Sequence, residues 1–487
     1  MNKKIHIEEE TARCLLCADA PCSQACKNGD PARAIRAIRF GNGQLAGQWV
    51  AACSDEELLE AEKACIHYDR PIRIRELLRP IETTHVAEKS QKSSLAIDFC
   101  GIRCENPFFL ASSAICTNYE MVARAFEAGW AGVFYKTICM QDINEVSPRF
   151  DAIQDEGRSD FYGFRNMEQL SENPMRVDFN ILKRLKHDYP SKVVIASIMG
   201  QTERQWITLA KMAEKAGVDA IELNFSCPQM RLAGMGSDVG QNPELVTFYT
   251  AYVKRNVSIP VIPKMTPNIT HISQPAMGAF FAGADAISAI NTIKSVTMNN
   301  RAAVSQQKTV SGYSGRAVKP IALRFILEMA QDPVLKDVQL SGIGGIETWH
   351  DALEYIQLGC RNVQVCTAVM QYGYRIIDDL ILGLQNYLQE RGVERLEELV
   401  GEELSSFVTP SKMDRHTIVY PKINHESCIG CGRCYTSCAD GGHQAITFDS
   451  QTRQPHIVGK RCVGCHLCRL VCPTGSIGTT RRIEKHQ

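Results

Sequence analysis

The chain has 487 residues, 44% of them hydrophobic and 22% charged, which is an ordinary composition for a globular protein. Lysine plus arginine and aspartate plus glutamate each number 54, so the formal net charge is zero and gives no indication of nucleic acid or an anionic membrane as a partner. The first residues, MNKKIHIEEE, lack the apolar stretch of a secretory signal, and no apolar run approaches the roughly 18 residues of a membrane-spanning helix. We expect a cytoplasmic protein that binds neither nucleic acid nor membranes.

The 21 cysteines are distributed unevenly along the chain. In a reducing cytosol, metal binding and catalysis are expected before structural disulfides. Four cysteines fall in residues 14–26 and eight in residues 428–472. This distribution predicts a small helical Cys-rich segment over 1–90, a middle domain over 95–395 and a C-terminal domain over 396–487.

The N-terminal motif, CLLCADAPCSQAC, has the spacing C-x2-C-x4-C-x3-C from Cys14 to Cys26. Closely spaced thiolates suit a metal centre, but such spacing specifies the metal loosely, so iron–sulfur and zinc are both open at this point.

The middle of the chain alternates short apolar runs with amphipathic segments of helical length. Near-continuous apolar strands, each followed by a helix, are typical of a parallel sheet buried on both faces. Eight such units over roughly 280 residues predict a (β/α)8 TIM barrel, with a doubly wound open sheet as the alternative. The eight runs cover residues 108–115, 131–138, 192–199, 220–227, 261–267, 286–292, 338–345 and 362–369.

In such a barrel, functional residues lie at the carboxyl ends of the strands and in the loops that follow. Those positions carry lysines, amides, hydroxyls and one thiol, and a long loop is expected after the second strand. Taken singly, a lysine there is usually a solvated charge, an asparagine often satisfies loop backbone, and a cysteine is commonly inert. Their joint occurrence on one face predicts a site made of Lys136, Asn166, Glu168, Asn224, Ser226, Cys227, Lys264, Asn291 and Thr292.

The loops after the last two strands contain glycines and small residues, which is typical of the phosphate site of these barrels. A redox ring anchored by phosphate at a barrel mouth suggests FMN. Lys264 or Lys136 is then expected beside the N1–O2 edge of the flavin, where a cation favours the anionic reduced form. The expected phosphate-side residues are Gly315, Gly344, Gly345, Cys366 and Thr367.

The C-terminal domain contains the motifs CIGCGRCYTSC and CVGCHLCRLVCP, each with the spacing C-x2-C-x2-C-x3-C. In two-cluster ferredoxins, three of these thiolates hold one cluster and the fourth holds the other. Paired zinc sites are the alternative, but they favour two C-x2-C pairs separated by a longer loop. We therefore predict two [4Fe-4S] clusters, one on Cys428, Cys431, Cys434 and Cys472 and the other on Cys462, Cys465, Cys468 and Cys438.

The segments NPFFLASS, FRNMEQLSEN, LNFSCPQM, KMTPN and SGIGGIE follow one another along the chain. In this order they resemble the dihydropyrimidine dehydrogenase family, above all the FMN- and cluster-carrying catalytic subunit of its bacterial NAD-dependent members, and the likeness covers about residues 95–480. The resemblance implies a dihydroorotate-dehydrogenase-like barrel with a C-terminal ferredoxin domain. It also implies reversible reduction of the 5,6 double bond of uracil or thymine.

The resemblance implies roles for the predicted site residues. Three asparagines (Asn166, Asn224, Asn291) and two hydroxyls (Ser226, Thr292) would bond the carbonyls and N–H groups of the pyrimidine, and Glu168 would accept from a ring N–H. FMN would deliver a hydride to C6, and Cys227 would give a proton to C5 from the other face as general acid. Gly234 and Gly236 would let the loop RLAGMG move.

The head also resembles this family, in the first half of the N-terminal cluster domain of the full-length enzymes. There the motif serves two clusters, together with downstream cysteines and a glutamine. This chain offers only Cys53 and Cys65 downstream, and Leu77-Leu78-Arg79 stands where the glutamine is expected. We therefore expect one further [4Fe-4S] cluster on Cys14, Cys17, Cys22 and Cys26, with a zinc site or a remnant without a cluster as alternatives.

No strand–GxGxxG–helix fingerprint for NAD or FAD occurs, so electrons are expected from a partner. The resemblance implies an NAD(P)H-oxidising FAD/iron–sulfur flavoprotein and a homodimer or heterotetramer. One alternative is dihydroorotate dehydrogenase, against which Glu168 argues because it would repel the carboxylate of orotate. Another is an electron-transfer subunit with a vestigial barrel.

Overall fold

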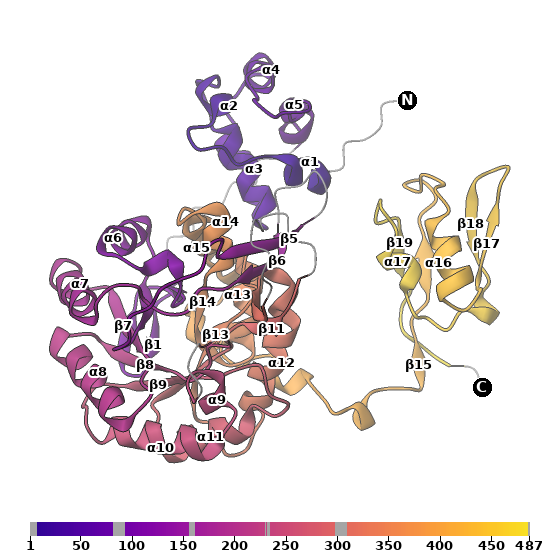
Figure 1. The fold of residues 1–487 in the computed structure, drawn as a ribbon. Coiled ribbons are helices and arrows are strands. Elements are labelled where there is room, and N and C mark those ends of the chain that lie inside the picture. Colours follow the sequence, from indigo (N-terminus) through magenta and orange to yellow (C-terminus); the bar gives the residue numbers. More distant parts are fainter. Residues whose placement is uncertain are drawn as a thin grey trace. The chain divides into compact units, whose positions relative to one another are not determined.

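The computed structural model describes residues 7–80, 93–154, 161–228, 230, 234–297 and 309–485. The chain divides into two compact units, and the division falls after Ser405. The larger unit, Ile7–Ser405, contains the helical head and the barrel, and the smaller one begins at Ser406 and is yellow in Figure 1. Within the described ranges, no helix has both the length and the apolar character needed to cross a membrane.

Eight parallel strands close into a barrel, in the order β10-β13-β14-β3-β4-β7-β8-β9. The predicted TIM barrel is therefore confirmed, and the open-sheet alternative is wrong. Closure runs through β14 and β3, where Val365 is in register with Leu110. The strands are β3 (Phe108–Leu110), β4 (Gly132–Ile138), β7 (Val193–Ile198), β8 (Ala220–Asn224), β9 (Val261–Lys264), β10 (Ala286–Ala289), β13 (Gln339–Ile343) and β14 (Cys360–Val365).

Helices cover the outside of the barrel, and four of them, α6, α8, α10 and α13, begin at a residue whose side chain caps the helix (Figure 1). The side chain of Thr202 caps α8 by accepting from the amide of Gln205, and Gly217 ends that helix in the left-handed region. Thr348 and Asp351 form a capping box at the start of α13. The covering helices are α6 (Tyr119–Ala128), α7 (Met175–Asp188), α8 (Glu203–Ala216), α10 (Pro243–Lys254), α11 (Ser273–Phe281), α12 (Lys319–Ala330), α13 (Trp349–Gln357) and α15 (Ile376–Arg391).

One layer inside the barrel is polar, although such interiors are usually filled by branched aliphatic residues. The Glu222 carboxylate accepts from the hydroxyls of Ser197 (2.9 Å) and Ser288 (3.1 Å). The Gln364 amide donates to the hydroxyls of Ser288 and Ser341, both at 2.8 Å. These side chains are fully buried or nearly so, and their mutual hydrogen bonds offset the cost of removing them from water.

An antiparallel sheet stands where the sequence predicts only a long loop. Its order is β11-β12-β6-β5, with Asn166 opposite both Phe150 and Gly312. Segments that follow the second barrel strand, β4, and the sixth, β10, thus meet over the barrel mouth, so no single stretch of sequence contains the pairing. The strands are β5 (Phe150–Gln154), β6 (Phe161–Asn166), β11 (Ile293–Ser295) and β12 (Ser311–Ser314).

The head is helical, as predicted, and it is attached to the barrel. Arg36 pairs with the buried Asp379 at 2.7 Å, and the Asn42 amide donates to the Asp379 carbonyl at 2.9 Å. The Arg375 guanidinium donates to the carbonyl of Leu16, inside the cysteine motif. The helices are α1 (Ile7–Arg13), α2 (Pro21–Gln24), α3 (Pro31–Arg39), α4 (Asp55–Lys63) and α5 (Ile74–Leu78).

The smaller unit is built from paired short strands around two short helices. β16 pairs with β19, β17 with β18, and β15 with β20, all antiparallel. The elements are β15 (Thr417–Ile418), β16 (Pro421–Ile423), α16 (Arg433–Gly441), β17 (Ile446–Asp449), β18 (Gln454–Ile457), α17 (Leu467–Leu470), β19 (Ile477–Thr479) and β20 (Ile483–Glu484).

Candidate functional site

A cavity opens at the carboxyl ends of the barrel strands and beneath the antiparallel sheet. Its empty volume is about 1030 Å³, open mouth included. Among the predicted residues, the cavity lining includes Lys136, Asn166, Glu168, Asn224, Cys227, Lys264, Asn291, Thr292, Gly315, Gly344, Gly345, Cys366 and Thr367.

Ser226 differs from the other predicted site residues, because it is fully buried behind the cavity wall. Its hydroxyl donates to Asn224 Oδ1 and accepts from Asn291 Nδ2, each at 2.9 Å. Asn224 Nδ2 in turn donates to Thr137 Oγ1 at 2.9 Å. Ser226 thus fixes two cavity amides, and its predicted direct contact with substrate stays a prediction.

Glu168 is held between two cations. Lys136 Nζ lies 3.0 Å from one carboxylate oxygen, and an Arg149 nitrogen lies 3.3 Å from the other. Two positive charges offset the single negative charge at short range. The expected repulsion of a carboxylated substrate by Glu168 is therefore weakened, and charge alone does not separate uracil from orotate here.

Cys227 lines the cavity and is only 6% exposed. Its carbonyl accepts from the Ser237 amide at 2.9 Å, at the start of α9 (Ser237–Gly240). Gly236 has φ +58, and a Cβ at this position would run into the Cys227 carbonyl. The backbone beside the thiol is thus fixed by α9, while residues 231–233 of the predicted moving loop lie outside the described residues.

The opposite end of the cavity is a backbone cradle. Gly344 and Gly345 have φ values of +132 and +68, and a Cβ on Gly345 would lie 2.8 Å from Lys319 Cβ and 3.0 Å from the Gly315 carbonyl. α14 (Thr367–Tyr372) begins here without a side-chain cap on its N-terminal amides. Close-packed glycines beside uncapped amides are suited to a phosphate group.

Sequence reasoning missed several cavity residues. Ser314 lies 3.0 Å from the Thr367 hydroxyl, and Ser113 lies 3.1 Å from the Cys366 sulfur. Burial raises the pKa of Cys366, so this thiol is neutral. Neither FYGFRN (161–166) nor SGYS (311–314) alternates apolar and polar residues, so the sequence carried no periodic signal for the sheet that contributes Tyr313 and Ser314.

The head gathers a different set of cysteines from the one predicted. Cys14, Cys17, Cys22 and Cys65 line one small, mainly apolar cavity with an empty volume of about 390 Å³. The Cys65 sulfur also accepts from the Ile72 amide at 3.4 Å. α4 and the turn after it bring Cys65 back to the motif, beside three of the four predicted cysteines, while the ligand role predicted for Cys26 stays a prediction.

Cys26 instead forms a buried pair with Cys53, and their sulfurs are 2.9 Å apart. Burial raises the pKa of Cys53 to about 12, so this thiol stays protonated near neutral pH. Gly29 packs directly against the pair, since a Cβ there would run into the Cys53 sulfur.

The smaller unit has two cysteine-lined cavities. Cys428, Cys431, Cys434 and Cys472 line one, and Cys438, Cys462, Cys465 and Cys468 line the other. Each cavity therefore receives three cysteines from one motif and the last cysteine of the other motif. Burial favours the protonated thiol of Cys472, but hydrogen bonds from Thr474 and the following backbone outweigh it and lower its pKa.

Across the described residues, no three cysteine, histidine or acidic side chains converge tightly enough to hold a single metal ion. A tetrahedral zinc ion with bonds of about 2.3 Å would need its sulfur ligands within roughly 4 Å of one another. Four cysteines around one cavity are the ligand number that a four-iron cluster takes.

The chain is 52% identical over 389 residues to the NAD-dependent dihydropyrimidine dehydrogenase subunit PreA of Escherichia coli K12, covering 79% of this chain and 94% of that protein. The chain belongs to the dihydropyrimidine dehydrogenase family. It is 36% identical over 346 residues to the chloroplastic dihydropyrimidine dehydrogenase (NADP(+)) of Arabidopsis thaliana, covering 68% of this chain and 81% of that protein. The family predicted from the sequence is confirmed.

Broader relatives agree with the fold. Residues 94–388 match the dihydroorotate dehydrogenase family, and residues 421–478 match a 4Fe-4S dicluster domain. The catalytic subunit of dihydroorotate dehydrogenase B (NAD(+)) from Pyrococcus abyssi is 36% identical over 313 residues, covering 63% of this chain and 98% of that protein. A dihydroorotate dehydrogenase structure from Eimeria tenella, 18% identical, superposes with a TM-score of 0.54 over 63% of this chain and 88% of that one, which supports the fold alone.

This dihydropyrimidine dehydrogenase homologue is therefore an NAD(P)-linked oxidoreductase that acts on CH–CH bonds. It combines an iron–sulfur domain with a barrel of a flavin-dependent family.

Proposed function

We propose that the chain is the catalytic subunit of a dihydropyrimidine dehydrogenase and reversibly reduces the 5,6 double bond of uracil or thymine. The carrying observation is that Cys227 shares one cavity with the amides of Asn166, Asn224 and Asn291 and the ammonium groups of Lys136 and Lys264. One cavity thus contains a proton donor, hydrogen-bonding groups for a flat ring and cations for a reduced cofactor.

The residues of the glycine cradle fit FMN. Gly315, Gly344, Gly345 and the first turn of α14 would hold its phosphate, and Lys136 and Lys264 would lie at its ring. When bound, FMN supplies the hydride for C6 of the pyrimidine.

The amides would orient the pyrimidine. Among the described residues, Asn224 Nδ2 meets one acceptor, Thr137 Oγ1, and so has a second N–H for a substrate carbonyl. Asn291 is fixed by Ser226 and by the Thr292 amide, which donates to Asn291 Oδ1 at 2.7 Å. Fixed partners of this kind discriminate against rings that lack matching groups.

Cys227 would hold the transferred proton at Sγ. A thiol is a weak acid that can carry a proton and give it to C5 of the pyrimidine. Its low exposure would exclude water from the reacting face.

Electrons would reach the barrel from an NAD(P)H-oxidising flavoprotein partner through [4Fe-4S] clusters. The C-terminal unit would hold two, on the cysteine sets that line its two cavities. The head would hold one more, on Cys14, Cys17, Cys22 and Cys65. The chain alone is then expected to be inactive with NADH and active with an artificial donor.

The test is Cys227→Ala in the cofactor-loaded protein, assayed for uracil reduction with an artificial donor. Loss of a positioned general acid is expected to lower the rate by about 10²–10⁴-fold. FMN content, measured from the flavin spectrum, should stay at the wild-type level. Cys227→Ser serves as the matched control, because its hydroxyl keeps a poor proton donor in place. A normal rate in Cys227→Ala would refute the proposal.

Oxidation of dihydroorotate is a second candidate, favoured by the pairing of Glu168 with Lys136 and Arg149 and by Arg316 at the cavity wall. These cations could accept a substrate carboxylate. Assays of uracil and of dihydroorotate on one preparation separate the two, and we expect turnover of uracil alone.

A further inference from the structure

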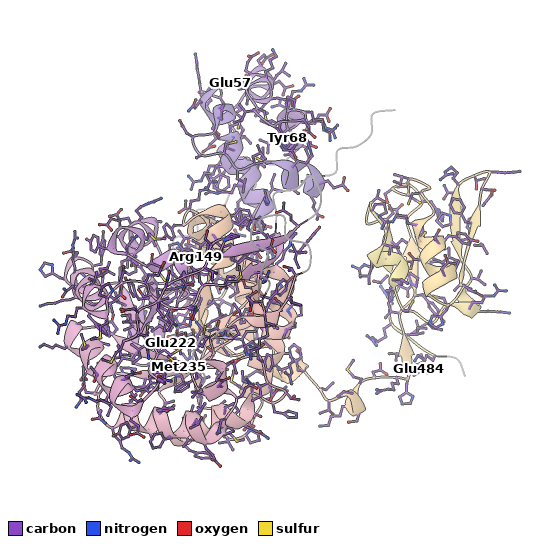
Figure 2. All side chains as sticks on the ribbon, viewed as in Figure 1. Glu57, Tyr68, Arg149, Glu222, Met235 and Glu484 are labelled. Atoms are coloured by element: carbon purple, nitrogen blue, oxygen red, sulfur yellow. The ribbon has the colours of Figure 1, made fainter. Side chains whose placement is uncertain are left out.

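A buried carboxylate lies inside the barrel below the cavity, and the proposed chemistry does not use it. Glu222 on β8 is 0% exposed, and Figure 2 shows it among the side chains of the barrel. Isolated buried charges are costly, so a retained one requires a partner. Its partners are the hydroxyls of Ser197 and Ser288 and the ammonium group of Lys264, whose Nζ lies 3.5 Å from Glu222 Oε1.

Lys264 lies between Glu222 and the cavity. It ends β9, in register with Asn224, and Glu222 precedes Asn224 by two residues on the neighbouring strand. The Lys264 side chain is 4% exposed and lines the cavity. At 3.5 Å from Glu222, it is beyond ordinary hydrogen-bond length, so its N–H donors remain available for a group in the cavity.

The polar layer fixes Glu222 from the other strands. Ser288, which donates to Glu222, also accepts from Gln364, and Gln364 donates to Ser341 as well. The layer therefore joins β7, β8, β10, β13 and β14 into one hydrogen-bonded set. A carboxylate held this way keeps its position when the charge above it changes.

We propose that Glu222 is a positioning residue that keeps Lys264 positively charged and directed at the cavity, and thereby sets the reduction potential of the bound flavin. This inference rests on the proposed FMN site. A cation beside the N1–O2 edge stabilises the anionic reduced flavin. A buried ammonium group without a counter-charge tends to lose its proton, so removing Glu222 should remove the cation that stabilises the reduced form.

The experiment is Glu222→Gln in the holoenzyme, with the FMN reduction potential measured by spectroelectrochemical titration at pH 7. Glutamine keeps the shape, and its amide oxygen can accept from one serine hydroxyl while its amide nitrogen donates to the other. We expect the equilibrium to shift tenfold or more toward oxidised FMN, which is a potential lower by about 30 mV for a two-electron couple. Ser341→Ala is the matched control, since it lies in the same layer and touches Gln364 but not Lys264, and it should leave the potential unchanged.

A double-mutant cycle separates this role from a general disturbance of the barrel. Lys264→Met should lower the potential by itself, and adding Glu222→Gln should lower it no further. Additive shifts, or a wild-type potential in Glu222→Gln, would overturn the inference. Glu222→Asp keeps the charge and should retain a near-wild-type FMN potential. This variant tests the inference even where Glu222→Gln fails to bind FMN. If Glu222→Asp lowers the potential as much as Lys264→Met does, the inference is also overturned.

The FMN content of the wild-type protein distinguishes failure of the proposed function from failure of the inference about Glu222. Wild-type protein reconstituted with FMN that retains none contradicts the proposed function. Wild-type protein with stoichiometric FMN, together with an unshifted Glu222→Gln variant, contradicts only the role of Glu222.

Discussion

The head and the C-terminal unit both enclose cysteines in apolar cavities, but the cavities are assembled differently. In the C-terminal unit, two similar motifs exchange their last cysteines, Cys438 and Cys472, so that two complete sites interlock. In the head, one motif contributes three cysteines, Cys65 completes the set, and Cys26 and Cys53 are left as a close pair. The two similar C-terminal motifs thus form two cavities that each need a cysteine from the other motif. The single head motif forms one cavity, and Cys26 and Cys53 lie outside it.

The two regions also differ in whether nearby or distant segments position the cysteines of a cavity. Short loops bearing Gly430 and Gly464, both at positive φ, shape the two C-terminal cavities from within their motifs. The head cavity depends on the packing of α4 and on the turn before α5. The position of Cys65, the fourth cysteine of this cavity, is therefore sensitive to changes far from the motif.

The largest expected effect concerns the [4Fe-4S] cluster that we propose for the head. Cys65→Ser should remove one cluster, so that iron falls from about 12 to about 8 atoms per chain, because a cluster needs its fourth thiolate. Iron and acid-labile sulfide assays on anaerobically reconstituted protein measure this. Cys26→Ser is the matched control and should retain all the iron. If Cys26→Ser loses the iron and Cys65→Ser keeps it, Cys26 is the fourth ligand, and the contrast between the head and the C-terminal unit disappears.

A smaller effect is expected at the contact between head and barrel. Arg36→Met leaves Asp379, which is 2% exposed, without its countercharge and should lower the free energy of unfolding by about 3 kcal/mol. Chemical denaturation of the full chain measures this. Lys63→Met, which removes the exposed pair with Glu60, should change stability by less than about 1 kcal/mol.

The loss in Arg36→Met should depend on pH. Burial raises the pKa of Asp379 to about 6, against the lowering effect of Arg36. A carboxyl whose folded pKa exceeds its unfolded value favours the folded state at low pH and loses that contribution as pH rises through about 6. The deficit of the variant should therefore be larger at pH 8 than at pH 5, and a deficit independent of pH would contradict this account.

The smallest effect concerns the pair of cysteines. Gly29→Ala places a Cβ against the Cys53 sulfur and the Trp49 carbonyl, and overpacking of this kind costs about 1–3 kcal/mol. Head iron should be unchanged, because the pair lies outside the Cys14–Cys65 cavity. Gly43→Ala has nothing within 4 Å of the new Cβ and should be neutral. Loss of iron in Gly29→Ala would show that the pair and the cavity form one site.

The sequence predicted most of the structural features that arise from repeated units or from short local motifs. Eight strand-length apolar runs predicted the closed barrel, and the spacing within each C-terminal motif predicted which cysteines share a cavity. Reading only strand ends found nearly all of the predicted cavity residues, because parallel strands bring those positions to one face.

What the sequence missed depends on contacts between distant segments. The antiparallel sheet joins β6 to β12, which are far apart in the chain, so no local period marks their pairing. Cys65 has no motif of its own, and Ser226 differs from its neighbours only in pointing away from the cavity. Glu222 resembles any charged residue until the barrel closes around it.

The bond between Ser226 and Asn291 limits how substrate preference in this enzyme can change. It joins Asn291, in the loop after β10, to the Asn224 segment at the end of β8. Neither amide can be exchanged without releasing the other, so a new hydrogen-bonding pattern requires at least two simultaneous replacements. Single-step divergence is then expected mainly on the opposite wall, where the antiparallel sheet contributes Phe164 and Tyr313.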